Sequence, residues 1–264
     1  MAKIPKSDLL LTELENHDIE YFRGDNNAPY ARVKEGDAYK IYEIDSNTFR
    51  DKLSYIYYKK YKSGLSKYFL DEVIGTLSAR AKFDGERFEL SVRCAKYQGE
   101  FWYALCNDKS QSVKTTDKGW EVVDNTPIIF QPYPHQKPQV IPQGNGDIDK
   151  IFDYVRLGKD NNTLFLAYLV SCFIPEISHP VPIFFGSAGS AKTTTNKVVK
   201  LLVDPSTYEL LPLPSTIKHL VDGFTKHWWC GFDNISGISK VMSDEICKAV
   251  TGGTAYFRKL YTDS

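Results

Sequence analysis

Apolar residues recur along the chain at two spacings. Residues 47–82 repeat them every three or four positions, in "NTFRDKLSYIYYKKYK" and "SKYFLDEVIGTLSARAKF", which predicts helices, with Asn47 as the first cap. Before them, "APYARV" and "AYKIYEI" alternate with the period of a strand. Residues 87–130 alternate again, and Gln98-Gly99 between two such runs predicts a hairpin.

The second half of the chain changes pattern after a proline-rich stretch. "QPYPHQKPQVIPQG" (131–144) holds four prolines and almost no periodicity, which indicates a linker. From about residue 146 the chain predicts a helix in "DIDKIFDYVRLG", a buried helix over 163–174, a strand in "VPIFFG" and a helix in "KTTTNKVVKLLVDP". Alternation of this kind favours an α/β domain with a parallel sheet.

We therefore expect three segments. Residues 1–130 form a smaller α+β N-terminal domain of unknown role, residues 131–145 a proline-rich linker, and residues 146–264 an α/β domain. The longest apolar run, 163–174, ends at Pro175 and is too short to span a bilayer, so no membrane partner is expected.

Composition indicates how a nucleic acid would be bound and in which compartment the protein is found. Hydrophobic residues make up 42% of the 264 residues and aromatics 14%, enough for a sizeable core. The 33 basic and 33 acidic residues balance, so a nucleic acid has to be held by a local basic patch. None of the five cysteines forms a C-x-x-C pair and no signal peptide is apparent, which favours reduced thiols and a cytoplasmic protein.

A phosphate-binding loop is the clearest motif. "VPIFFGSAGSAKTTT" (181–195) fits G-x-x-x-x-G-K-[ST], except that Ala191 stands where the second glycine is usual. An apolar strand, a turn of small residues and a helix are the three parts that such a loop needs. Lys192 would reach the β- and γ-phosphates of ATP, and the Thr193 hydroxyl would ligate Mg²⁺. The expected nucleotide contacts are consecutive: Gly186, Ser187, Ala188, Gly189, Ser190, Ala191, Lys192, Thr193 and Thr194.

Two expectations concern the start of the helix after this loop. Ala191 is expected at a helical position with negative φ, where a methyl group costs little. Val198, Val199, Leu201 and Leu202 are expected on the buried side of the helix. The alternative interpretation of the whole stretch is a turn of small residues with a surface lysine.

A second motif follows the loop lysine by 41 residues. In "HWWCGFDNIS" (227–236) an apolar strand ends at Asp233, as a Walker B motif requires, and its carboxylate would hold Mg²⁺ from the neighbouring strand. Alone, the segment is equally a strand followed by an Asp-Asn turn. Its pairing with the phosphate loop favours the nucleotide site.

From about residue 100 onward the chain resembles the helicase-like ATPase domains of phage, plasmid and integrated-element replication proteins. These virus-type primase-helicases are close to superfamily 3 helicases of the AAA+ class. The resemblance rests on the order and spacing of "GWEVVD", "PIFFGSAGSAKTT", "LLVDP", "FDNISGI", "SDEICKAVTGG" and "RKLYTD". It implies an AAA+-like P-loop fold with a parallel sheet and flanking helices, a DNA-acting ATPase using ATP and Mg²⁺, and assembly into a homo-oligomeric ring.

The resemblance also implies where single-stranded or forked DNA would bind. In the family, the "TGG" segment lies beside a hairpin that carries basic residues, which here makes Lys248, Arg258 and Lys259 the candidates. They can equally be ordinary solvated charges. Tyr256, Phe257 and Tyr261 could stack on bases or belong to the core.

Two departures from the family bear on catalysis, for which Lys192, Asp233 and Asn234 are the expected residues. An acidic residue often follows the Walker B aspartate, whereas this chain has Asn234, which can orient water but cannot accept its proton. The sensor strand and the arginine finger of the family would follow Ser264, so the ATPase domain is expected to be incomplete at its C-terminus. A non-hydrolysing, ATP-dependent DNA- or partner-binding module is therefore the alternative function, and a small-molecule P-loop kinase is a weaker one.

Overall fold

The computed structural model describes residues 4–25 and 27–251. The chain divides into two compact units: residues up to Leu90 together with Ile129–Pro132, and Ser91–Ile128 together with the chain from Tyr133 onward. This division differs from the expected boundary at residue 130, because the strands that follow residue 91 belong to the second unit. The stretch expected as a linker also bonds within that unit, where the Lys137 amide donates to the Pro205 carbonyl at 2.9 Å.

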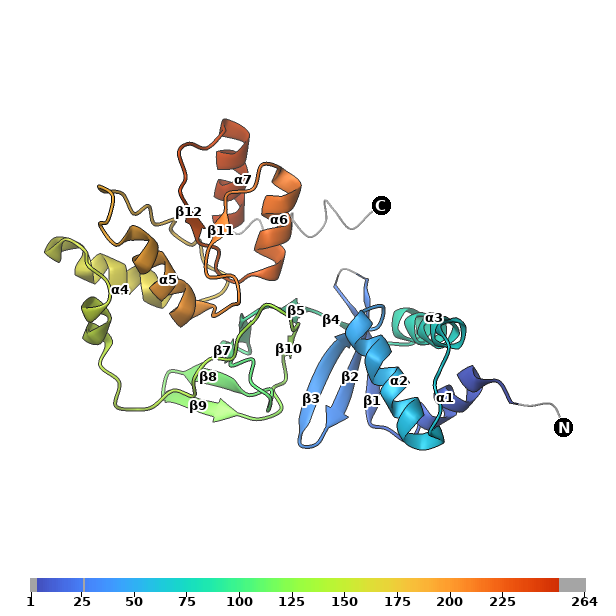
Figure 1. Ribbon diagram of the computed structural model, residues 1–264. Coiled ribbons are helices and arrows are strands. Elements are labelled where there is room, and N and C mark those ends of the chain that lie inside the picture. The colour runs from blue at the N-terminus through green and yellow to red at the C-terminus, as the bar shows by residue number, and fades with distance from the viewer. Residues whose placement is uncertain (1–3, 26, 252–264) are drawn as a thin grey trace. The chain divides into compact units, whose positions relative to one another are not determined.

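A four-stranded sheet with the order β3-β2-β1-β4 is the centre of the first unit (Figure 1). Strands β1 (Ile19–Gly24), β2 (Pro29–Glu35) and β3 (Ala38–Glu43) pair antiparallel, and β4 (Arg87–Phe88) is parallel to β1. The two predicted strands are confirmed as β2 and β3. The short β5 (Leu90–Ser91) pairs with β10 (Ile129–Phe130).

Three helices accompany this sheet: α1 (Lys6–Leu14), α2 (Asn47–Tyr61) and α3 (Lys67–Phe83). The last two were predicted from their periodicity and are confirmed. The cap of α2 differs by one residue, since Ser46 is the residue whose hydroxyl accepts the Phe49 N–H. The core between helices and sheet includes residues that are fully shielded from solvent: Leu10, Ala31, Ile44, Leu53, Val73, Leu77 and Ala81.

The second unit begins with an antiparallel meander. Its strands are β6 (Cys94–Tyr97), β7 (Glu100–Ala104), β8 (Ser112–Thr116) and β9 (Gly119–Val123). The predicted hairpin is confirmed between β6 and β7. Its two turn residues, Gln98 and Gly99, both have positive φ, at 52° and 83°, as a two-residue hairpin of this twist requires.

Helices and short strands make up the rest of the second unit. They are the 3₁₀ helices η1 (Ile148–Asp153) and η2 (Lys159–Asn161), then α4 (Asn162–Ser171), α5 (Lys192–Val203), β11 (Leu211–Pro212), α6 (Ile217–Lys226), β12 (Phe232–Asp233) and α7 (Lys240–Val250). The α-helix expected in "DIDKIFDYVRLG" (147–158) is thus the shorter 3₁₀ helix η1. The predicted helices at α4 and α5 are confirmed.

Among the described residues of the second unit, the predicted parallel sheet is present only as one short pair. β11 runs parallel to β12 over two residues, and the expected strand in 181–186 is not a strand. In this segment the side chains of Ile183 and Phe185 are 79% and 91% exposed, because no described strand lies beside them. The protein is therefore a mixed α/β chain with several small sheets, and a larger P-loop sheet is not seen among the described residues.

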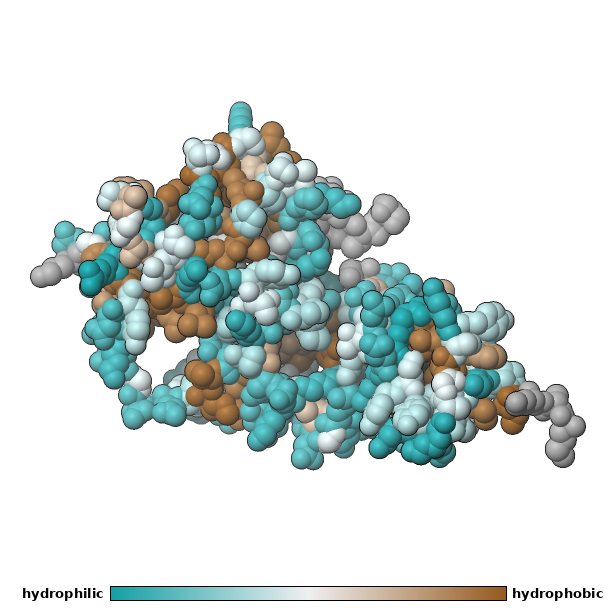
Figure 2. Space-filling model, viewed as in Figure 1, coloured by the Kyte–Doolittle hydropathy of each residue, from teal (hydrophilic) through white to brown (hydrophobic). Residues whose placement is uncertain are grey.

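Helix α5 packs through one narrow stripe. Val199 and Val203, four residues apart on one face, are fully buried, while Leu201 is 63% exposed. The expectation that Leu201 and Leu202 face the core was wrong. Leu201 lies about 200° from the Val199 direction on the helix, on the opposite side. Leu202 lies about 60° from that direction and, at 39% exposed, is at the edge of the buried stripe. Figure 2 likewise shows apolar surface around α4 and α5.

No helix among the described residues combines the length and the hydrophobicity needed to cross a bilayer.

Candidate nucleotide site at the start of α5

The turn before α5 depends on left-handed backbone conformations. Gly186 has φ 151° and Gly189 has φ 76°. A Cβ atom added to Gly186 would lie 2.9 Å from the Ser190 hydroxyl, closer than real Cβ contacts come. Both glycines of the motif are therefore required by the turn itself.

Ala191 also has a left-handed conformation. Its φ is 61° and its ψ 17°, at the N-cap of α5. The expectation of a helical position with negative φ was wrong, because the chain has to reverse at this residue to enter the helix. An alanine here carries a conformational cost of about 1–2 kcal/mol that glycine would not carry.

The loop surrounds the ammonium group of Lys192. Its Nζ donates to the carbonyls of Gly186 and Ser187, at 3.0 and 2.7 Å, and to the Ser190 hydroxyl at 3.2 Å. The positive charge thus lies inside the turn of small residues and is not directed away from it. This arrangement argues against the alternative of a turn with an unrelated surface lysine.

The first turn of α5 has no side-chain cap, because Ala191 offers no acceptor. The unpaired N–H groups and the positive end of the helix are the features by which phosphate groups are held at helix N-termini. Together with the adjacent ammonium group, they make this corner attractive to an anion. A Cβ atom added to Gly189 would have nothing within 4 Å, so the loop is open to solvent on that side.

Thr193 and Asp233 meet at the edge of this corner. The Thr193 hydroxyl lies 3.2 Å from each carboxylate oxygen of Asp233, which ends β12. Forty residues of chain separate them. A hydroxyl and a carboxylate at this separation are hard oxygen donors of the kind that Mg²⁺ takes, usually together with water and substrate phosphates.

A cleft of about 900 Å³ opens beside this pair. Thr193, Asp233 and Asn234 line it, together with Lys197, whose Nζ pairs with Glu209 at 2.7 Å. Asn234 has φ 56°, and its N–H donates to Asp233 Oδ1 at 3.0 Å. Asparagine tolerates this conformation better than most residues, which gives a backbone reason for an amide after the aspartate.

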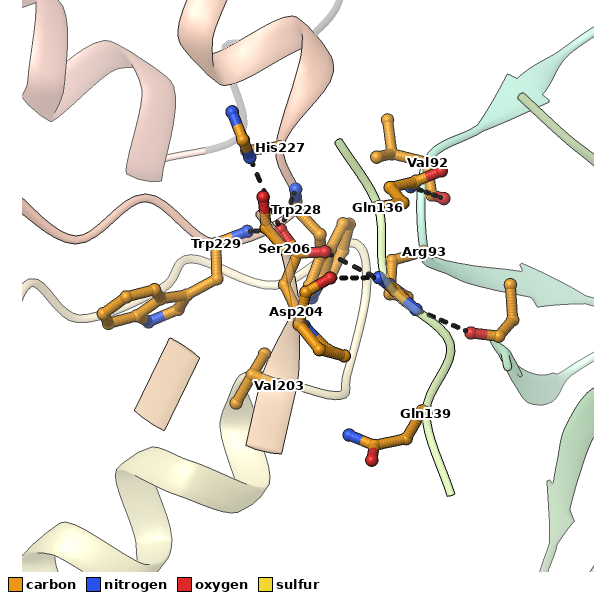
Figure 3. Close-up of polar contacts among 12 residues, drawn as sticks. Val92, Arg93, Gln136, Gln139, Val203, Asp204, Ser206, His227, Trp228 and Trp229 are labelled. Carbon is orange, nitrogen blue, oxygen red and sulfur yellow. Dashed lines mark hydrogen bonds and ion pairs between the residues drawn. The ribbon is translucent and has the colours of Figure 1, made fainter. Parts of the chain in front are cut away.

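A buried ionic cluster holds the segments that carry the site. Arg93, which is fully shielded, donates from Nε to Asp204 Oδ1 at 3.1 Å (Figure 3). Its terminal nitrogens donate to the carbonyls of Ala104, Lys137 and Pro205. The guanidinium thus joins the meander to the C-terminal end of α5, which explains why residues 91–128 belong to the second unit.

Lys200 completes the cluster from within α5. Its Nζ donates to Asp204 Oδ2 and to the Trp229 carbonyl, both at 2.7 Å, and lies 3.3 Å from Nδ1 of His227. All three N–H groups are used if Nδ1 of His227 accepts, which requires a neutral imidazole protonated at Nε2. Burial, with Lys200 and His135 nearby, lowers the pKa of His227 to about 4, in agreement with the neutral form.

The aspartate at the centre of the cluster stays ionised. Burial opposes its charged form, but Lys200 and Arg93 outweigh this, so the pKa of Asp204 lies below its usual value. Asp204 Oδ2 also accepts the N–H groups of Trp228 and Trp229, at 3.0 and 3.2 Å. The two indoles donate in turn to the Cys172 carbonyl and the Tyr168 hydroxyl, which fixes this segment against α4 and the residue after it.

The cluster sets the path of the chain into Asp233. Trp229 is bound to Lys200 near the end of α5, and Asp233 is bound to Thr193 at its start. From Thr193 to Lys200 the helix advances seven residues, or about 10.5 Å. From Trp229 to Asp233 an extended chain advances four residues, or about 13 Å. Because the two lengths are similar, an extended segment antiparallel to α5 brings the aspartate to the loop.

Sequence reasoning did not find the cluster residues. Asp204 lies within "LLVDP", but no sequence pattern indicates its role, and Arg93 carries no local signal. Of the DNA candidates, Lys248 lies in the last turn of α7 and pairs with Glu245 at 2.6 Å. Arg258 and Lys259, with the aromatics beside them, lie outside the described residues, so a common basic patch stays a prediction.

Comparison with known proteins supports one part of this picture. Residues 148–264 match the family model of the actinomycete integrative conjugative element replication protein. The match supports a role in the replication of a mobile element. It covers the phosphate loop and Asp233, but not the first unit or the meander. No curated protein and no solved structure matches the chain.

Proposed function

We propose that the protein is an ATP-binding and ATP-hydrolysing, helicase-like ATPase that acts on DNA in the replication of a mobile element or virus. The observation that carries the proposal is the contact between Thr193 and Asp233 beside the Lys192 loop. The match of residues 148–264 to a conjugative-element replication protein supports the replication context.

The described residues suit Mg-ATP by their chemistry. Lys192 would exchange loop carbonyls for the β- and γ-phosphates, and the loop is open beside Gly189, where an added Cβ would have nothing within 4 Å. The Thr193 hydroxyl and the Asp233 carboxylate would hold Mg²⁺, which supplies charge neutralisation at the transferred phosphate when bound. Asn234 would orient the attacking water through its amide.

DNA and a second protomer are the partners that complete this proposal. The predicted contacts with single-stranded or forked DNA are Lys248, Arg258 and Lys259. Assembly into a homo-oligomeric ring would bring nucleotide sites to the boundaries between protomers, as the family resemblance implies.

Equilibrium binding of Mg-ATP to the Lys192→Ala variant tests the proposal. We expect loss of measurable binding, because the loop loses its only cation for the phosphates. Lys226→Ala is the matched control, since Lys226 is an exposed lysine that pairs with Asp222 in α6. An unchanged dissociation constant in Lys192→Ala would remove the nucleotide-site assignment.

Asn234 favours a second candidate, a module that binds ATP without hydrolysing it. The residue directly after Asp233 is an amide, Asn234, which cannot accept a proton from water, and the later Glu245 is engaged with Lys248. The two candidates differ in the rate of phosphate release at saturating Mg-ATP. If the protein binds Mg-ATP but releases phosphate no faster than the Lys192→Ala variant, the non-hydrolysing module is favoured.

A further inference from the structure

We propose that one face of α2, formed by Tyr55, Tyr58, Lys59 and Lys62, binds single-stranded DNA. This tyrosine–lysine face lies in the first unit, outside the residues that the family model matches. It gives a ligand to a unit in which no sequence motif was found. The inference shares the DNA context of the proposed function but does not depend on the nucleotide site.

Charge is concentrated along this part of the chain. Residues 1–90 carry 15 lysines and arginines and 16 aspartates and glutamates, whereas residues 52–70 carry five lysines and no acidic residue. The first unit is thus close to neutral as a whole but strongly basic in one segment. The nearest acidic residue before it, Asp51, lies one helical turn from Tyr55.

The two lysines of the face are available to phosphate groups. Lys52 and Lys60 are held by Glu35 and Glu13, at 2.6 and 3.2 Å. Within residues 4–25 and 27–251, neither Lys59 nor Lys62 forms an ion pair with a carboxylate. Both can therefore neutralise DNA phosphates without breaking an ion pair with a carboxylate.

The tyrosines present their rings beside these charges. Tyr55 and Tyr58 are 55% and 53% exposed and, at i and i+3, are neighbours on the helix surface. Lys59 Nζ lies 5.8 Å from the centroid of the Tyr55 ring, and Lys62 Nζ lies 5.8 Å from that of Tyr58. Each ammonium lies over one face of its ring, which leaves the other face to stack on a base. Aromatic rings combined with positive charge are the features by which single-strand binders hold bases and backbone.

Helix stability does not account for these residues. Lysines near a helix C-terminus complement its dipole, which explains the position of Lys59 but not two half-exposed tyrosines. Lys62 is the C-cap, with φ 51°, where glycine is favoured and lysine is disfavoured by about 1–2 kcal/mol. Helix capping therefore does not explain a lysine at this position, whereas a use for its side chain does.

A nucleic-acid single strand fits this face better than a duplex does. Stacking on tyrosine requires a base whose face is free, and the bases of a duplex are already stacked on one another. A flat lysine patch without aromatics would bind duplex and single strand alike through phosphates. We therefore expect preference for the single strand and little preference for its sequence.

Anisotropy of a labelled oligo-dT of about 20 nucleotides, measured over a salt series without nucleotide, tests the charges. Lys59→Ala/Lys62→Ala should flatten the slope of log K against log salt by about 1.4, since each phosphate contact contributes about 0.7 on single strands. The control Lys109→Ala/Lys118→Ala removes two exposed lysines from turns of the second unit and should leave the slope unchanged.

The tyrosines are tested in the same assay. Tyr55→Ala/Tyr58→Ala should weaken oligo-dT binding at least about ten-fold with little change of slope, because stacking of a base is lost at each ring. Tyr55→Phe/Tyr58→Phe keeps the rings and should bind like the wild type. Equal thermal melting of all variants establishes that they fold.

Unchanged slope and affinity in both α2 alanine variants would overturn the proposal. The proposal would also be overturned if these variants bound vesicles of anionic lipid more weakly than the wild type but bound oligo-dT equally well. The face would then be a membrane contact. If the variants lost affinity equally for duplex DNA and for oligo-dT, the face would contact phosphates alone. That result would overturn the stacking assignment. Lys192→Ala should bind oligo-dT normally in the absence of nucleotide, which separates this proposal from the nucleotide site.

Discussion

The hydroxyl of Thr193 lies 3.2 Å from both carboxylate oxygens of Asp233, although 40 residues separate them in the chain. The contact is made possible at the far end of α5, where Lys200 holds the backbone of Trp229. A hydroxyl and a carboxylate held in this way are available as a pair to a divalent cation.

Asp233→Asn should weaken binding of Mg-ATP by at least ten-fold and binding of Mg-free ATP by much less. The amide keeps the shape of the side chain but lacks the charge that a magnesium shell requires. Titration calorimetry with and without Mg²⁺ gives both constants. Asp222→Asn, which removes an exposed carboxylate from α6, is the control, and equal losses in the two variants would contradict the assignment.

Ala191→Gly should stabilise the protein by about 1 kcal/mol, because Ala191 has a left-handed conformation that glycine adopts without cost. ATP affinity should not fall. Ala188→Gly is the matched control in the same turn, since Ala188 is not among the residues with positive φ and glycine there only adds freedom to the unfolded chain. Denaturant unfolding measures both changes, and a loss of stability in Ala191→Gly would contradict the left-handed geometry.

Asn234→Asp should be tolerated better than Asn234→Glu, by about 1 kcal/mol in the free energy of unfolding. Aspartate shares the tolerance of asparagine for the left-handed region, which glutamate lacks. The aspartate variant also places an acid after Asp233 at little structural cost. Phosphate release by this variant at saturating Mg-ATP should therefore exceed that of the glutamate variant.

Asp204→Asn should destabilise the protein by about 3–5 kcal/mol, because Arg93 and Lys200 would both be left as buried charges without a counter-charge. Arg93→Lys should also be costly, since one ammonium cannot replace a guanidinium that donates from three nitrogens. Asp222→Asn, in an exposed pair, should cost less than about 1 kcal/mol. Similar midpoints for Asp204→Asn and Asp222→Asn would rule out the cluster as a stabilising element.

Stability should fall as the pH is lowered from about 6.5 towards 4. The pKa of His227 is lowered to about 4 in the folded protein, so the unfolded chain takes up the proton first. The loss is absent above the unfolded pKa and reaches at most about 1.4 kcal/mol per pH unit for one histidine. His227→Gln should flatten this dependence.

The contribution of the neighbouring histidine can be separated. Burial also lowers the pKa of His135, so some dependence should remain in His227→Gln and decrease further in the double variant with His135→Gln. Urea unfolding at about pH 5 and pH 7.5 measures the difference. An unchanged pH dependence in the double variant would show that neither imidazole is held neutral by the fold.

The sequence by itself determined the local features. The spacing of apolar residues predicted α2, α3 and α5, because a helix buries one face and repeats it every three or four residues. Gln98-Gly99 predicted its hairpin because few residue pairs accept two positive φ angles. The loop from Gly186 to Thr193 was likewise visible as a run of small residues before a lysine.

Only the tertiary structure decided the rest. The φ of Ala191 follows from how the loop closes onto α5, which no residue within the loop reveals. Arg93 and Asp204 are 111 residues apart, and no periodicity links them, so the membership of the meander in the second unit could not be predicted. Long-range pairs of this kind depend on the packing of whole elements, whereas a sequence pattern reports only what each element buries by itself.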